Sequence, residues 1–81
     1  MEMEEMIYNI FKEQFDISDV INSDTNLIDE FGFESISFVE LGGILSKKTG
    51  IKIDQFEAIQ WTTVNSILKT LNANEKTDAN D

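Results

Sequence analysis

The first fifteen residues carry apolar side chains at the spacing of one helix face. These positions are Met3, Met6, Ile7, Ile10, Phe11 and Phe15. Because an α-helix repeats about every 3.6 residues, the spacing predicts a helix over residues 3–15. The acidic residues of its first turn suit the positive end of the helix dipole.

From residue 16 to residue 34 this periodicity is lost, and serine, aspartate and asparagine cluster between positions 18 and 26. The segment is therefore predicted to be a long loop. Its apolar residues are too many for a free linker, so we expect the loop to be pinned across the domain. They are Ile17, Val20, Ile21, Leu27, Ile28 and Phe31.

A second helix is predicted to begin near Ser35 and to end at Gly50, since Lys47 and Lys48 precede a glycine suited to a helix C-terminus. On a helical wheel, one side of this segment forms the expected core face: Phe38, Leu41, Ile44 and Leu45. Ile36 and Val39 fall on the opposite side. They are either ordinary exposed residues or a docking patch for a partner.

The remainder of the chain predicts a short helical turn through Phe56, Ala58 and Ile59, then a last helix capped by Thr62 or Thr63. The last helix has an apolar stripe at Val64, Ile67, Leu68 and Leu71. The fold class is therefore all-α: a four-helix bundle with a long loop between helices one and two and a short third helix. Residues 1–72 form the predicted domain, and residues 73–81, with almost no apolar side chains, form a predicted disordered tail.

Ser35 has two interpretations. A serine between a glycine-containing loop and a helix is a plausible N-cap, and a Ser37–Glu40 capping box would start the helix two residues later. In both cases its hydroxyl lies at the positive end of a helix dipole, where an attached phosphodiester would be favoured by about 0.3–1 kcal/mol.

The charge of the chain restricts its partners. Sixteen acidic and six basic residues give a net charge of −10 over 81 residues, which disfavours binding to nucleic acid or insertion at an anionic membrane. Residues 1–34 hold ten acids and one lysine, a net charge of −9. A partner with a basic surface is therefore expected to approach the first helix and the loop.

The chain has no histidine and no cysteine. It therefore lacks the residues of Ser-His and Cys-His nucleophilic sites, and we expect no catalytic activity of its own. No metal site is expected either, because the acidic segment from Asp24 to Ser35 has no glycine at its sixth position and lacks the alternating carboxylates of an EF-hand loop. The acidic N-terminus does not resemble a signal peptide, and the expected location is cytoplasmic.

The segment Asn26-Leu27-Ile28-Asp29-Glu30-Phe31-Gly32-Phe33-Glu34-Ser35-Ile36 resembles the signature of the acyl carrier protein family, and the likeness extends over residues 3–72. The resemblance implies that Ser35 receives 4′-phosphopantetheine from coenzyme A through a phosphopantetheinyl transferase. It also implies that acyl-loading, condensing or tailoring enzymes recognise Glu34, Ile36, Val39 and Glu40. Further expectations are a monomer that tethers acyl thioesters for fatty acid, polyketide or related biosynthesis and shelters an acyl chain between its helices.

Several positions depart from the family pattern. Residues 35–49 have a net charge of +1, and Gly42 and Gly43 lie inside the helix, so a specialised carrier is favoured over a housekeeping one. Trp61 is expected to pack against the domain, although it resembles the tryptophan of D-alanyl carriers. An aminoacyl, peptidyl or D-alanyl carrier and an unmodified interaction domain are therefore the alternatives.

Overall fold

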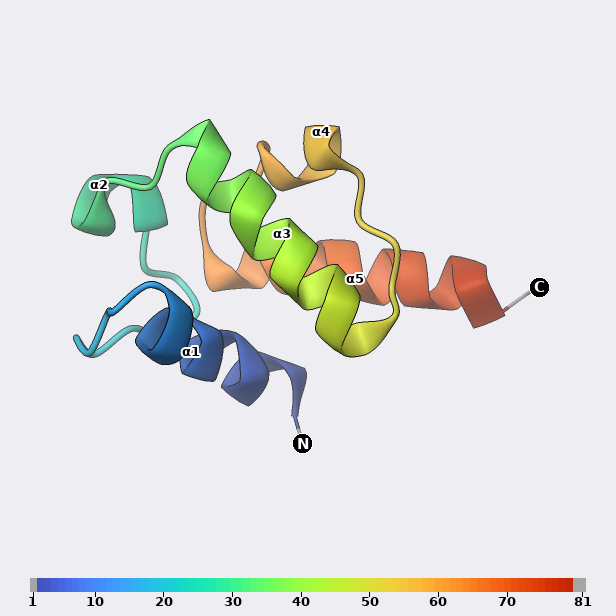
Figure 1. Cartoon of the computed structure of the whole chain (residues 1–81), viewed down its shortest axis with the longest axis horizontal. Coiled ribbons are helices and arrows are strands. Elements are labelled where there is room, and N and C mark those ends of the chain that lie inside the picture. Colours follow the sequence, from blue (N-terminus) through green and yellow to red (C-terminus); the bar gives the residue numbers. More distant parts are fainter. Residues whose placement is uncertain (1, 80–81) are drawn as a thin grey trace.

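A computed structural model describes residues 2–79, with side chains described for residues 2–75, and confirms the all-α fold. Figure 1 shows its helices, with α3 running diagonally past the long α5. In chain order they are α1 (Met3–Gln14), α2 (Leu27–Phe31), α3 (Ser35–Thr49), α4 (Gln55–Ala58) and α5 (Val64–Ala79). Helix α3 packs on α4, and α1 packs on α5.

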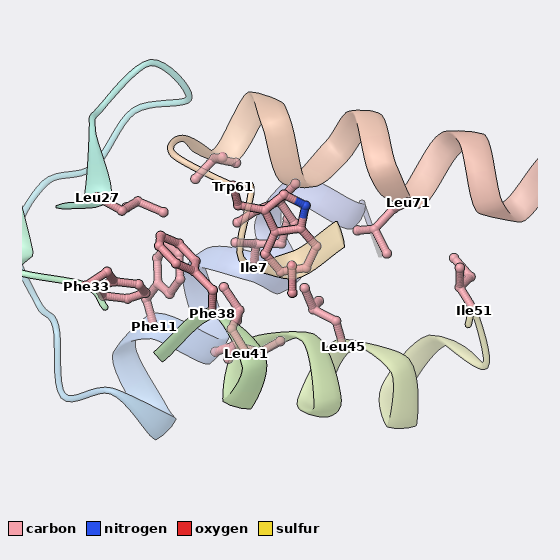
Figure 2. Packing of buried hydrophobic residues seen from close by; sticks show 14 residues of the cluster. Ile7, Phe11, Leu27, Phe33, Phe38, Leu41, Leu45, Ile51, Trp61 and Leu71 are labelled. Atoms are coloured by element: carbon pink, nitrogen blue, oxygen red, sulfur yellow. The ribbon is translucent and has the colours of Figure 1, made fainter. Parts of the chain in front are cut away.

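The core lies between the helices and is apolar: none of the buried residues in the described part of the chain is polar or charged. Figure 2 shows how its side chains converge on the centre of the molecule. Trp61 is 2% exposed, and its indole N–H donates to Thr70 Oγ1 at 2.9 Å. The expectation that Trp61 packs inside the domain is confirmed.

The long loop contains a helix that periodicity did not predict. Helix α2 begins after Asn26, whose Oδ1 accepts hydrogen bonds from the backbone N–H groups of Ile28 and Asp29, both at 3.0 Å. It ends at Gly32, which has a φ of 69°. Five residues are too few to show a 3.6-residue period, but an asparagine cap and a C-terminal glycine suffice to define one turn.

The loop is pinned to the start of α5, as predicted. The Leu27 N–H donates to the Thr62 carbonyl at 2.8 Å, and Asn65 Nδ2 donates to Asp24 Oδ1 at 2.7 Å. Leu27 is fully buried, whereas Val20 is 98% exposed and Ile28 is 44% exposed. The loop is therefore pinned by only some of its apolar residues, and Val20 and Ile28 take little part.

The helix boundaries agree with the predictions except at the C-terminus. Helix α3 spans the predicted residues and ends at Gly50 with a φ of 76°, and Thr63 Oγ1 accepts from the Ser66 N–H at the start of α5. Helix α5 continues to Ala79 and so includes residues 73–79, which the sequence predicted to form a disordered tail; residues 80 and 81 lie outside the described residues.

A contact outside the helix supports the first turn of this extension. The side-chain amide of Asn74 donates to the Lys52 carbonyl at 2.8 Å and to Glu57 Oε1 at 3.1 Å. A polar composition predicted disorder because it offers little apolar surface to bury, yet these hydrogen bonds tie the helix to the segment around α4. Among the described helices, none is long and apolar enough to cross a membrane.

Candidate functional site

The start of α3 is built by three consecutive residues with different roles. Gly32 turns the chain in the left-handed region at the end of α2. Phe33 is then buried, with 6% of its surface exposed, and Glu34 takes an extended conformation as the N-cap of α3. The buried ring fixes the entry of the chain, so the next residue, Ser35, is held at the first position of the helix.

The Ser35 side chain is exposed, and no described residue makes a hydrogen bond to its hydroxyl. Neither sequence interpretation of the cap was correct, because Glu34 is the N-cap and pairs with Ser37 in a capping box. The Glu34 N–H donates to Ser37 Oγ at 3.1 Å. Glu34 therefore takes the N-cap role considered for Ser35, Ser37 is its partner at the third helical position, and the Ser35 hydroxyl is left available to reagents in solvent.

Aromatic rings support this helix start from inside. The ring of Phe33 stacks on Phe15, with centroids 5.4 Å apart and an angle of 24° between the planes, and lies 5.2 Å from the ring of Phe38. Figure 2 shows Phe33 and Phe38 beside each other at this end of the core. Because one ring precedes Ser35 by two residues and the other follows it by three, the backbone at Ser35 is anchored on both sides.

The four predicted partner-contact residues all lie on the surface of this end of α3. Glu34 and Glu40 are exposed, Ile36 is 74% exposed and Val39 is 37% exposed. Ile36 is adjacent to Ser35 in the chain, and Val39 lies one helical turn further on. The structure thus leaves these carboxylate and aliphatic side chains accessible at the start of α3, and their role in partner binding stays a prediction.

Two further exposed apolar residues lie on α4 and were missed as surface candidates. Phe56 is 67% exposed and Ile59, at the C-cap, is 37% exposed. The sequence placed both in the short helical turn but gave no signal about which side would face solvent. A four-residue helix shows too little periodicity, and here it buries only Ala58.

The charge around the candidate site is negative. Helix α2 exposes Asp29 and Glu30, and the next turn of chain exposes Glu34. The first turn of α3 itself has no acidic residue, and its cations, Lys47 and Lys48, lie in the last turn. The serine therefore lies at the positive end of a helix dipole but is approached across an acidic loop.

A small helical bundle with an apolar core and an accessible hydroxyl at a helix start is consistent with a carrier type of domain, in which chemistry takes place on a group attached to the surface. The sequence matches the family described as "Phosphopantetheine attachment site" over residues 5–71. The chain belongs to this family, and its cofactor is covalently bound 4′-phosphopantetheine. No curated protein sequence matches the chain significantly.

Proposed function

We propose that this chain is an acyl carrier protein that tethers acyl intermediates through Ser35 and presents them to enzymes of fatty acid, polyketide or related specialised biosynthesis. The observation that carries the proposal is the exposed Ser35 hydroxyl, free of hydrogen bonds to described residues, at the first position of α3. It lies inside the span that matches the phosphopantetheine attachment family. The chain supplies the attachment point, and partner enzymes supply the catalysis.

The residues around Ser35 fit attachment of the arm. Its hydroxyl oxygen forms the new bond to phosphorus as the nucleotide part of coenzyme A leaves, and the hydroxyl proton passes to a base of the transferase. The capping box between Glu34 and Ser37 keeps the helix start folded without using the Ser35 hydroxyl. When bound, the arm supplies a terminal thiol, the nucleophile that a cysteine-free chain lacks.

We further propose that partners contact the exposed face next to Ser35. Ile36 and Val39 supply apolar area, and Glu34 and Glu40 supply charge at its edge. An apolar centre with a charged rim is the usual composition of a protein interface. The acidic loop before α3 would attract a basic partner toward the serine, so binding is expected to weaken as salt is added.

The experiment that tests the function is intact-mass measurement after incubation with coenzyme A and a broad-specificity phosphopantetheinyl transferase. We expect the parent chain to gain the mass of one phosphopantetheine arm. Ser35→Ala should show no gain. Ser37→Ala is the matched control, because it removes a hydroxyl two residues away and should still be modified.

Two outcomes would contradict the proposal. An equal mass gain in the parent and in Ser35→Ala would place the modification on another residue. No gain in the parent, while a known carrier in the same reaction is modified, would favour the alternative of an unmodified interaction domain.

A further inference from the structure

The seam between α3 and α4 is closed at its centre. Gly42 is buried, and a β-carbon added to it would lie 3.2 Å from Cβ of Ala58 and 3.5 Å from Cγ2 of Ile53. It would also lie 3.7 Å from Cη2 of Trp61. Since non-bonded carbon atoms settle about 3.5–4.0 Å apart, the seam has no free space here, and an added methyl group would fit only if Ala58 moved away by a few tenths of an ångström.

The end of the core that lies behind Ser35 is filled by aromatic rings. Phe38 is 2% exposed, with its ring centroid 5.2 Å from that of Phe33 and 6.4 Å from that of Trp61. Figure 2 shows Phe33 and Phe38 between the start of α3 and the centre of the core. A chain that entered from the serine would have to displace these rings.

The interior beyond the rings is also occupied. Leu41, Leu45 and Ile67 are fully buried, and the Trp61 indole is held by its hydrogen bond to Thr70. Burial of an apolar chain is favourable when it removes apolar surface from water without exposing other surface. Here each inserted methylene would displace a packed side chain, so insertion would give little net burial and would strain the core.

We propose that the closed α3–α4 seam keeps the cargo outside the bundle, so that this carrier takes acyl groups that are short or polar. The inference rests on the carrier function proposed above. It replaces the expectation that the helices shelter an acyl chain. A long apolar chain would remain in water at a cost that rises with its length, whereas a short or polar group has little apolar surface to hide.

The test loads Ser35 with acetyl, hexanoyl or decanoyl arms, using the corresponding acyl-coenzyme A and a broad-specificity transferase. Trp61 is the only tryptophan, so its indole N–H gives an assignable reporter of the core in nitrogen–proton correlation spectra. We expect the Trp61 signal to be the same for all three arms. We also expect hydroxylamine to cleave all three thioesters at the same rate, because none is protected.

A variant that widens the seam provides the matched control. Ile53→Ala removes the Cγ2 methyl group that faces Gly42, and since Ile53 is only partly buried, the bundle should stay folded. In the widened seam the decanoyl arm is expected to shift the Trp61 signal. That shift shows that the reporter detects a chain between the helices.

The outcomes separate the two proposals. A Trp61 shift in the parent that grows with chain length, or cleavage that slows with chain length, would overturn the inference and leave the carrier function intact. If intact mass shows that none of the three arms attaches to Ser35, both proposals are overturned. Spectra and cleavage rates in the parent that do not depend on chain length support the inference.

Discussion

The outer and inner faces of α3 differ in solvent exposure and in role, although they belong to one helix. The outer face exposes Ser35, Ile36 and Val39 to solvent. The inner face buries Phe38 and Leu41 in the core. One face is therefore available for attachment and contact with partners, and the other holds the domain together, so substitutions on the two faces should have separable effects.

Gly42 and Gly43, which are adjacent in α3, show the difference between the two faces most directly. A β-carbon at Gly42 would meet Ala58 at 3.2 Å, whereas one at Gly43 would have nothing within 4 Å. Glycine lowers helix stability at both positions, because it loses more backbone freedom on folding than other residues. Only at Gly42 does packing require it, so the same residue type is needed on one face and dispensable on the other.

The largest effect is expected from truncating an apolar residue on each face. Phe38→Ala should destabilise the fold by about 3–5 kcal/mol, since it removes a buried ring and leaves a cavity. Ile36→Ala should change stability by less than about 0.5 kcal/mol, because its side chain is already 74% exposed. Urea denaturation followed by circular dichroism measures both. Similar losses from the two variants would mean that the faces are not separated as described.

The two glycines should respond to alanine with opposite signs. Gly43→Ala should stabilise the protein by about 0.5–1 kcal/mol, as the helix gains propensity in open space. Gly42→Ala should destabilise it by about 1 kcal/mol, because overpacking outweighs the same gain. Helix α4 is tied to α5, which limits how far it can move away from α3, since Asn74 Nδ2 donates to Glu57 Oε1 at 3.1 Å and to the Lys52 carbonyl at 2.8 Å.

A double-mutant cycle with Ala58→Gly sharpens this prediction. Removing the facing methyl group should make Gly42→Ala harmless or stabilising in that background. Denaturation midpoints of the four proteins give the coupling. Additive effects would show that the Ala58 contact does not limit the space at Gly42.

The two serines at the start of α3 form a third pair. Ser37→Ala should cost about 1 kcal/mol, because it removes the hydroxyl that accepts from the Glu34 N–H in the capping box. Ser35→Ala should leave the stability within about 0.5 kcal/mol of the parent, since its hydroxyl has no hydrogen bond to a described residue. Thermal unfolding of both variants checks this. A larger loss for Ser35→Ala would give that hydroxyl a capping role.

The last effect is absent at neutral pH and appears only in alkaline solution. The inner face of α3 buries no ionisable group, whereas on α1 burial, a hydrogen bond to Glu4 and the negative charges of Glu4 and Asp24 raise the pKa of Tyr8 from 10.0 to about 12. The folded state holds the phenolic proton more tightly than the unfolded state, so stability should fall as the pH rises from 10 toward 12 and be unaffected below that range.

Tyr8→Phe is the control for this prediction, because phenylalanine has no phenolic proton. This variant should lose less folding stability than the parent between pH 10 and pH 12. Tyr8 is also the only tyrosine, so tyrosinate absorbance in the folded protein measures its pKa directly. A midpoint near the ordinary tyrosine value would show that the environment of α1 does not act on the ring in this way.

Much of the fold could be predicted from the sequence because the long helices repeat their apolar residues often enough to show a period. Helix α3 was predicted with both ends, since Gly50 and the preceding lysines mark its C-terminus. Helix α2 was not, because five residues show no period and its asparagine cap resembles ordinary loop sequence. The end of α5 was placed too early, because the bond from Asn74 to Lys52 joins segments distant in sequence.

The candidate site was predicted in part. The exposure of Ile36 and Val39 followed from their position on the wheel, opposite the core face. The cap did not follow, because serine and glutamate can both serve as an N-cap or as its partner, and only the observed backbone assigns Glu34 to one role and Ser37 to the other. The closed seam at Gly42 depends on how α4 packs against α3, and a local sequence pattern does not predict that packing.

The attachment of the long loop to α5 has a consequence for the order of assembly. Asn65 joins the loop through hydrogen bonds to Ser23 and Asp24, and the Asp24 contact spans 41 positions of the chain. During synthesis, the N-terminal half therefore cannot complete its loop until residue 65 has left the ribosome. The loop that leads toward α2 and α3 is then completed among the last parts of the domain, and a chain truncated before residue 65 lacks these two hydrogen bonds.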